Sequence, residues 1–438
     1  MSEDPRVEPL HRYLREAAHA CVRRPVDRFR HPWLAPMPPS DEAARYLAER
    51  ARGGPDARLE GGDRFALGDY ALGLFHHDVS EAAIALAREG GELAEACLGS
   101  LLCFLDCASP DGCIHRIELP HKARDPEPAK PVMAQLAVRA IDGLGARGLE
   151  LAAEHRVLPR LLAFLAYLER THVGLHGRFL TPSARASGFD SDVLTAGMPE
   201  RSVEGPDTNA FMVLEYRAAA SLARRLGEAG EADRLEAKAE RLRDLVEALL
   251  YHEDEDGGLY VGLRWQHGRA TLDEERGSHR VPDGRLRPFE TWTGLLPLYA
   301  GIPSPARAAA LLRRLHDPAR FWGPAGVRTL SARSPFFSQA PRVLVYDPRR
   351  GHRGPVSNWS GPVWVLSSWY LARGLERYGY AEDARALDRA TFALLAADLE
   401  RTGVLHECYA DGGEGLWPRR GTFVSWNVLA LTLGPSDP

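Results

Sequence analysis

Residues 207–251 read DTNAFMVLEYRAAASLARRLGEAGEADRLEAKAERLRDLVEALLY, which is two helical patterns separated at Gly227. The first pattern contains Phe211-Met212-Val213-Leu214 and is apolar on nearly every side, as is typical of a helix buried all round. The second has one apolar face, made by residues three or four positions apart: Leu235, Ala239, Leu242, Val246 and Leu249. Glycine commonly ends a helix. The segment therefore predicts a buried helix paired with one that keeps a charged face.

The whole chain follows this arrangement. Helices are predicted at residues 7–23, 69–89, 91–107, 131–143, 157–171, 207–227, 229–251, 288–300, 304–316, 360–379, 383–399 and 422–433. Short connections near residues 90, 145, 228, 302 and 381 alternate with long ones at residues 24–68, 108–130, 172–206, 252–287, 317–359 and 400–421. Because the alternation is strict, the long connections all leave one end of a stack of antiparallel helix pairs. Long connections that recur in a compact domain are usually functional.

The composition of the helices favours two layers. Those after long connections are apolar, as at residues 289–299, whereas Pro305–His316, after a short connection, carries a charged face. We therefore predict an all-α fold, an (α/α)6 barrel or six-hairpin toroid, forming a single domain over residues 1–438. Residues 24–68, with a short helix at 41–52, are expected to be a loop-rich surface excursion, and residues 257–260 a short hairpin. The alternative is an open α-solenoid that binds proteins, but no repeat motif recurs.

Bulk properties narrow the function. The 438 residues are 45% hydrophobic and 26% charged, and the net charge of −5 without a basic run argues against nucleic acid as a partner. No apolar run is long enough to span a bilayer, and the first residues lack the apolar segment of a signal peptide. A cytoplasmic protein without a membrane partner is expected. The six cysteines lack the paired spacing of a zinc site, so we predict free thiols, no metal site and no cofactor.

Two acidic loops, each between predicted helices, carry the candidate chemistry. Ser187-Gly188-Phe189-Asp190-Ser191-Asp192 and Leu405-His406-Glu407-Cys408-Tyr409 lie more than two hundred residues apart. Lone carboxylates on equivalent loops favour a general acid and a general base brought together by the fold, with Asp190 and Glu407 as the candidates. Without other evidence, an aspartate such as Asp190 in a Gly-Ser loop is most often an Asx-turn or helix-cap residue, and Glu407 alone would be a solvated loop acid.

Other polar and aromatic residues stand just before the predicted inner helices, where they would face the mouth of the barrel. Aromatic faces cover the C–H face of a sugar ring, and charged groups bind its hydroxyls. We therefore expect a small saccharide or glycoside as partner, bound by Phe65, Asp69, Lys130, Trp265, Trp359, Trp364, His406, Tyr409 and Trp417. The oligomeric state stays open between a monomer and a homo-oligomer.

The ordered motifs carry a family resemblance. The loop at residues 187–191 resembles the Ser-Gly-aromatic-Asp-x-Ser loop of glycoside hydrolase family 63 and its trehalase relatives. Asn358-Trp359-Ser360-Gly361-Pro362-Val363-Trp364 is similar to the Trp-x-Gly-Pro-Val-Trp segment of that family, and residues 405–409 to its C-terminal base loop. The resemblance covers about residues 60 to 433 and is nearest to the small mannosylglycerate-hydrolase-like members.

The resemblance implies inverting hydrolysis of an α-glucosidic or α-mannosidic bond. Asp190 would protonate the leaving oxygen, and Glu407 would activate a water on the opposite face of the sugar. Such carboxyls stand ~6.5–9.5 Å apart, whereas a retaining pair stands at ~5–5.5 Å. The pKa of Asp190 is expected to be raised by burial or by a neighbouring carboxylate such as Asp192.

The sequence also departs from the family pattern. A Trp-Asp-Ser element reads Gly68-Asp69-Tyr70, so a sugar-stacking tryptophan is missing, although Asp69 remains a candidate ligand for a sugar hydroxyl. A Gln-Pro-Pro element reads Lys130-Pro131-Val132, and Lys130 would either pair with a carboxylate or phosphate of the substrate or point to solvent. Of Trp359 and Trp364, we expect one in the core and one in the site. His76-His77-Asp78 is expected on the surface.

Two other functions fit the same barrel. A sugar isomerase or epimerase would use histidines as acid and base, with His115, His121 and His406 as the candidates. A non-catalytic carbohydrate- or protein-binding barrel would explain the missing tryptophan.

Overall fold

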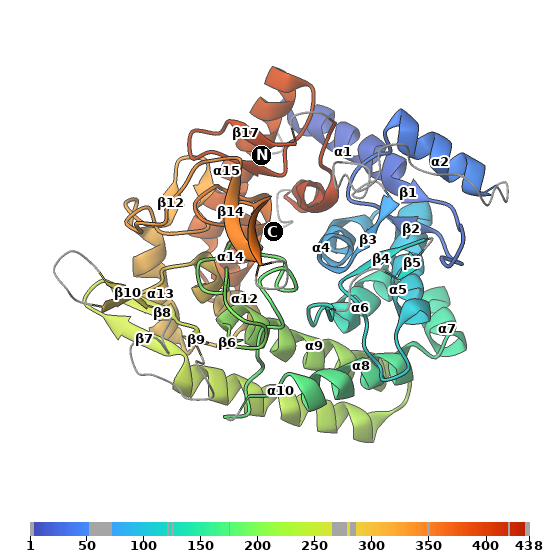
Figure 1. Cartoon of the computed structure of the whole chain (residues 1–438), viewed down its shortest axis with the longest axis horizontal. Helices are drawn as coiled ribbons and strands as arrows, with labels where there is room; N and C mark the ends of the chain where they lie inside the picture. Colours follow the sequence, from blue (N-terminus) through green and yellow to red (C-terminus); the bar gives the residue numbers. More distant parts are fainter. Residues whose placement is uncertain are drawn as a thin grey trace.

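The structure, a computed structural model, describes residues 4–51, 72–120, 122–123, 127–174, 176–264, 278–280, 286–347, 351–418 and 421–433. Within these ranges the inner layer consists of α4 (His76–Leu86), α6 (Met133–Leu144), α9 (Pro206–Arg225), η1 (Trp292–Gly294) with α12 (Pro297–Ala300), α14 (Val365–Arg377) and η2 (Ser425–Thr432). Each inner segment contacts the next one along the chain, and η2 contacts α4 (Figure 1). The inner layer is therefore a closed ring.

An outer layer surrounds this ring. It contains α1 (Val7–Cys21), α5 (Gly91–Cys107), α7 (Ala146–Glu154), α8 (Val157–Thr171), α10 (Ala229–Leu249), α13 (Pro305–His316) and α15 (Ala381–Thr402), with α2 (Asp41–Ala51) beside it. Inner and outer helices alternate along the chain, which confirms the (α/α)6 barrel and rules out the open solenoid, because a solenoid does not close on itself. No helix in the described ranges combines the length and the hydropathy needed to cross a bilayer.

Burial follows the sequence pattern. Every residue of α4 is buried, whereas α10 buries one stripe, namely Ala232, Leu235, Ala239, Leu242 and Val246. Leu249, expected on the same stripe, is 46% exposed because α10 ends at this residue. Helix α10 thus follows the periodic pattern expected of the outer layer, whereas α5, in the same layer, is buried along nearly all of its length.

Helix boundaries differ from the prediction at three of the inner segments. The helix expected at residues 288–300 is divided into η1 and α12, because Pro297 has no N–H to continue the helical ladder. The segment expected at residues 422–433 is a 3₁₀ helix, η2. The helix expected from residue 69 begins as α4 at His76, and residues 69–71 lie outside the described ranges. Helix α7 was not predicted.

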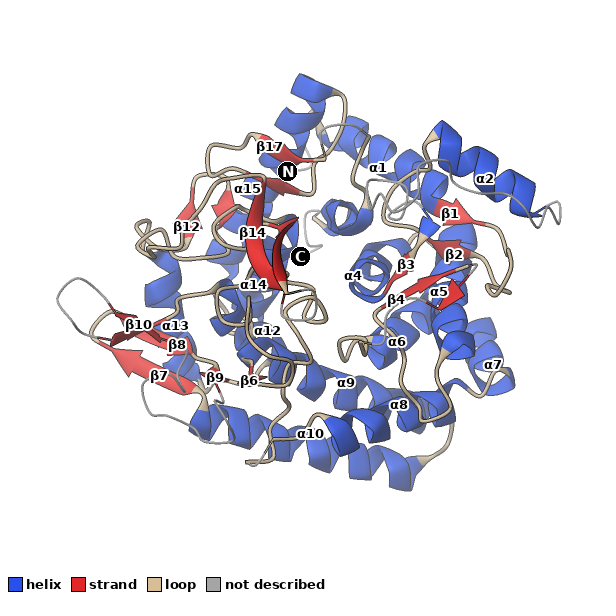
Figure 2. Ribbon diagram, viewed as in Figure 1, coloured by secondary structure: helices blue, strands red, loops and turns tan. Residues whose placement is uncertain are grey.

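Short hairpins fill the connections (Figure 2). The paired strands are β1 (Val22–Arg23) with β2 (Trp33–Leu34), β3 (Leu74–Phe75) with β4 (Ile117–Leu119) and β5 (Lys122–Ala123), β6 (Val203–Glu204) with β9 (Leu263–Arg264), β7 (Tyr251–Asp254) with β8 (Gly257–Tyr260), β10 (Ser278–Arg280) with β11 (Leu286–Pro288), β12 (Trp322–Gly323) with β13 (Gly326–Val327), β14 (Arg342–Asp347) with β15 (His352–Ser357), and β16 (Cys408–Tyr409) with β17 (Gly415–Trp417). The hairpin at residues 257–260 is confirmed. The longer β14–β15 hairpin was not predicted.

The segment at residues 24–51 is not the surface excursion that the sequence predicted. Phe29 and Trp33 are 1% and 0% exposed, and the N–H of Leu34 donates to Ser100 Oγ on α5 at 2.9 Å. The carbonyl of Pro36 accepts from Val424 and Ser425 at the start of η2. The segment therefore links the outer helix α5 to η2, which closes the inner ring against α4.

One buried carboxylate joins two inner helices and gives the first prediction. Glu215 on α9 accepts hydrogen bonds from the N–H groups of Ala134 and Gln135, in the first turn of α6, at 2.6 and 3.3 Å. Glu215→Ala leaves these buried donors unsatisfied, so we expect the free energy of unfolding to fall by about 1–3 kcal/mol in chemical denaturation. Glu236→Ala, on the exposed side of α10, should change it by less than about 1 kcal/mol. Equal losses in the two variants would contradict this role.

Candidate active site

The acidic loop at residues 187–192 is folded tightly above α4. Gly188 has φ +80°, and a Cβ at this position would stand 2.3 Å from Nδ1 of the buried His77. Ser187 Oγ accepts from the N–H of Phe189 at 3.0 Å, and Asp192 Oδ1 accepts from the N–H of Leu194 at 2.9 Å. These bonds close both ends of the loop and leave Asp190 between them.

The second motif, residues 358–364, packs against this acidic loop. The N–H of Trp359 donates to Ser191 Oγ at 2.7 Å, and Ser360 Oγ donates to the Ser191 carbonyl at 2.7 Å. The Trp359 ring stacks on Trp364 with centroids 3.6 Å apart and meets Phe189 at 4.7 Å. Both tryptophans are buried, at 2% and 0% exposure. The two rings stack on each other in the core, and the expectation that one of them contacts a sugar stays a prediction.

The third motif is joined to the second by a short antiparallel bridge. Val363 and Tyr409 exchange backbone hydrogen bonds of 2.8 and 2.9 Å. Trp426 Nε1 donates to the carbonyl of Glu407 at 3.2 Å, and Asn427 Nδ2 donates to that of His406 at 2.8 Å. The two acidic loops are thus connected through residues 358–363.

Three carboxylates interact electrostatically at this junction. Burial raises the pKa of Asp190, against the nearby guanidinium groups of Arg116, Arg185 and Arg342. Burial also raises the pKa of Glu407 well above its usual value, opposed by Arg342 and reinforced by Asp78 and Asp190. Burial raises the pKa of Asp78 to about 7, and Asp190 adds to this effect. The site therefore holds three carboxyls whose protonated forms are favoured by burial.

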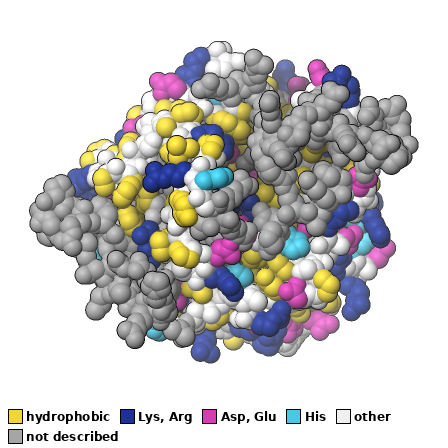
Figure 3. Space-filling view, viewed as in Figure 1, with side chains coloured by type: hydrophobic (Ala, Val, Ile, Leu, Met, Phe, Trp, Pro, Cys, Tyr) yellow, Lys and Arg dark blue, Asp and Glu magenta, His cyan; other side chains and the backbone are white. Residues whose placement is uncertain are grey.

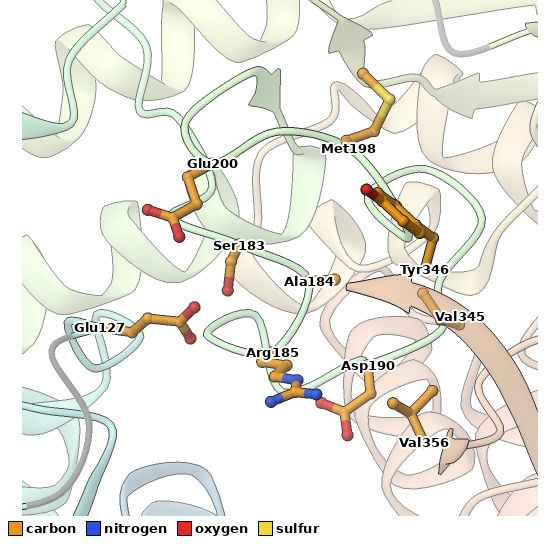
Figure 4. A pocket seen from close by; sticks show the side chains of 11 residues that line it. Glu127, Ser183, Ala184, Arg185, Asp190, Met198, Glu200, Val345, Tyr346 and Val356 are labelled. Carbon is orange, nitrogen blue, oxygen red and sulfur yellow. The ribbon is translucent and has the colours of Figure 1, made fainter. Parts of the chain in front are cut away.

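Asp190 borders an open hollow of about 450 Å³ (Figure 4). One wall carries the polar side chains of Arg185, Glu127 and Glu200. The facing wall is more apolar and comes from Met198 and the β14–β15 hairpin, through Val345, Tyr346 and Val356. The hairpin also exposes Leu344 and Tyr346, at 66% and 47%, and hydrophobic side chains gather on this part of the surface in Figure 3.

The remaining predicted ligands separate into three groups. Tyr409 is fully buried, with its OH accepting from the His406 N–H at 3.1 Å, and His406 Nδ1 lies 2.8 Å from Asp398 Oδ2. The side chains of both residues therefore already have hydrogen-bond partners within the protein. Trp417 is partly exposed, with the Arg342 guanidinium 5.4 Å from its ring centroid, and stays a candidate sugar platform. Phe65, Asp69, Trp265 and His121 lie outside the described residues.

Lys130 does not point to solvent. It is 1% exposed, and its Nζ donates to the Ser187 carbonyl at 2.8 Å, beneath the acidic loop. We therefore no longer count it among the substrate ligands. His115, a candidate for the isomerase alternative, has its Nδ1 2.8 Å from Glu118 Oε1. Neither His115 nor His406 lines the hollow, so the geometry does not favour histidine chemistry.

Sequence reasoning missed Asp78 and Arg342. His76, His77 and Asp78 were expected on the surface, but they are 3%, 4% and 7% exposed, because they form the first turn of the inner helix α4. Their position at the start of an apolar helix after a long connection was the available signal. Arg342 belongs to the unpredicted hairpin. The described residues contain no cluster of His, Cys, Asp and Glu suited to a metal ion.

A closed (α/α)6 barrel with paired acidic loops at the ends of its inner helices defines a glycosidase-type protein. The family model of the mannosylglycerate hydrolase MGH1-like glycoside hydrolase domain matches residues 122–424, and the chain belongs to this family. The resemblance to glycoside hydrolase family 63 is thereby confirmed.

In sequence, individual relatives match less of the chain than the family model does. Mannosylglycerate hydrolase MGH2 of Selaginella moellendorffii is 33% identical over 130 residues, which cover 28% of this chain. The match spans about a fifth (22%) of that protein's length. The structure of the Thermus thermophilus GH63 mannosylglycerate hydrolase with glucose superposes with a TM-score of 0.58 at 23% identity, covering 81% of this chain and 91% of that one. Its complex with Tris and D-glycerate gives 0.57 at 22%, covering 89% and 98%.

The fit of Gly188 against His77 gives the second prediction. Gly188→Ala introduces a Cβ at positive φ and into contact with the His77 ring, whereas Gly197→Ala introduces one at φ +74° with its nearest neighbouring atom 3.9 Å away. Both variants carry the left-handed strain of about 1–2 kcal/mol. We expect Gly188→Ala to lose about 1–3 kcal/mol more in chemical denaturation. It should also change the near-ultraviolet circular dichroism of the Phe189–Trp359 contact. Equal effects of the two substitutions would show that the close packing is unimportant.

Proposed function

We propose that the protein is an inverting glycoside hydrolase that cleaves an α-glucosidic or α-mannosidic bond in a small glycoside. Asp190 is the general acid and Glu407 the general base. The observation that carries the proposal is that these two carboxyls, 217 positions apart in the sequence, stand on loops joined by hydrogen bonds through residues 358–363, and that Arg342 lowers the pKa of both. Membership of a glycoside hydrolase family supports it.

The surroundings of the two carboxyls suit different roles. Asp190 borders the hollow, where it can protonate the oxygen of a leaving alcohol, and burial raises its pKa in the direction that favours the protonated form. Glu407 is 2% exposed and must be ionised to accept a proton from water. Burial, Asp78 and Asp190 raise its pKa, and Arg342 opposes this rise. For inversion, the carboxyls stand ~6.5–9.5 Å apart, with the water between Glu407 and the sugar.

The substrate follows from the relatives and from the hollow. The curated relatives are named mannosylglycerate hydrolases, and one fold relative was crystallised with D-glycerate. We therefore place a glycosylglycerate first among the substrates to test. Trp417 is the candidate platform for the sugar ring. On sequence grounds Asp69 is retained as a ligand of a sugar hydroxyl, with Phe65 and Trp265 beside it.

Product stereochemistry tests the assignment. A proton NMR time course on mannosylglycerate, glucosylglycerate, trehalose, kojibiose, nigerose and maltose should show release of the β-anomer before mutarotation. Asp190→Asn and Glu407→Gln should each lower kcat/KM by about 10²–10⁴-fold on the active substrate, because each removes one proton transfer. Initial release of the α-anomer would overturn inversion. Full activity of either variant would overturn that residue's role.

The shared arginine gives a pH prediction. Arg342 holds down the pKa of both Asp190 and Glu407, so Arg342→Gln should raise both. The rising limb of kcat/KM follows deprotonation of Glu407 and the falling limb follows deprotonation of Asp190. Both limbs should therefore move to higher pH, by roughly half a unit to one unit.

Arg353→Gln provides the matched control for this prediction. Arg353 lies opposite Tyr346 in the same hairpin and is exposed, so its substitution should leave the pH profile in place. Limbs that move in opposite directions, or a profile of Arg342→Gln that coincides with that of Arg353→Gln, would contradict the shared electrostatic role.

A further inference from the structure

The acidic loop rests on one buried cation. Lys130 Nζ donates to the carbonyl of Ser187 at 2.8 Å and lies 3.8 Å from the centroid of the Phe189 ring. These contacts hold the residues on either side of Gly188, directly before Asp190. A buried ammonium interacts strongly with a carbonyl and an aromatic face, because water does not compete for it.

The Lys130 ammonium also contacts two residues of α9. Asp207 Oδ2 on α9 lies 3.5 Å from Nζ, and the centroid of the Phe211 ring lies at 4.1 Å. Burial lowers the pKa of Lys130 to about 8, against the opposing effects of Asp207, of Glu81 on α4 and of Asp192 in the loop. Lys130 therefore connects the acidic loop to α9 through contacts that a neutral apolar side chain does not make, and its charge is also stabilised by Glu81 of α4.

We propose that Lys130 is a positioning residue for the general acid: it fixes Ser187 and Phe189, and through them the direction in which the Asp190 carboxyl enters the hollow. This inference rests on the proposed role of Asp190. A displacement of about 1 Å in a catalytic group can cost 10²-fold in rate, so loss of this support has a measurable effect even in a folded protein.

Two leaving groups separate misplacement of the acid from general damage. An alcohol must be protonated as its bond to the sugar breaks, whereas fluoride, the anion of a much stronger acid, leaves with little protonation. The substrate pairs are mannosylglycerate with α-mannosyl fluoride, and glucosylglycerate with α-glucosyl fluoride. The ratio of kcat/KM for glycoside to fluoride does not depend on the fraction of folded enzyme.

Lys130→Met keeps the length of the side chain but removes the donor and the charge. We expect it to lower the glycoside-to-fluoride ratio by about 10–100-fold, mainly through kcat on the glycoside. Lys130→Gln retains a donor without the charge and should give an intermediate ratio. Lys238→Met is the control, because Lys238 pairs with Glu169 in the outer layer, and its ratio should equal that of the wild type.

Asp190→Asn separates the two levels of the argument. The positioning role alone is overturned if the glycoside-to-fluoride ratio collapses in Asp190→Asn but is unchanged in Lys130→Met. Equal losses on both substrates in Lys130→Met would give this unchanged ratio. A ratio unchanged in Asp190→Asn, or no turnover of either fluoride by the wild-type enzyme, overturns the proposed function.

Discussion

The site depends on the backbone and hydroxyl hydrogen bonds that join three distant segments at the starts of inner helices. Ser191 binds Trp359 and Ser360, and four residues beyond Trp359, Val363 pairs with Tyr409. Each acidic loop alone has too few internal contacts to hold a carboxylate in one orientation against its conformational entropy. The closed ring supplies the missing constraint, because it brings the helix starts to fixed neighbours.

This junction is costly to build, since it buries like charges together. Asp78 and Asp190 raise the pKa of Glu407, and Asp190 raises that of Asp78, in a region largely removed from water. Arg342 partly offsets this cost. It lies on the β14–β15 hairpin, which belongs to neither helix layer. The aromatic stack around Trp359 stabilises the floor without adding polar groups. Apolar packing thus supports a strained electrostatic arrangement, as is common at catalytic sites.

The sequence was sufficient where a single physical pattern determines the result. Periodicity and connection length predicted the two-layer barrel, and the acidic loops were identified from their residues. Arg342 was missed because its strand pairs with one containing Gly354 and Pro355, which lacks the alternating pattern of a strand. The sequence left open which of Trp359 and Trp364 belongs to the core, because an aromatic residue at a helix start looks the same in sequence whether it faces a sugar or another tryptophan. Such distinctions depend on the tertiary neighbours.

The structure also indicates how the chain can depart from its family pattern and keep the same chemistry. Asp190 and Glu407 stand on the connections that precede α9 and η2 and that the floor holds in place, whereas the described wall of the hollow comes from Met198, Tyr346 and neighbouring connection residues. Changes in these connections alter what fits beside the acid without moving the hydrogen bonds of the floor. Gly68 and Lys130, the two departures noted in the sequence, are then separable. Lys130 belongs to the support of the loop, so its effect is on the acid's orientation, and substrate choice is left to the walls.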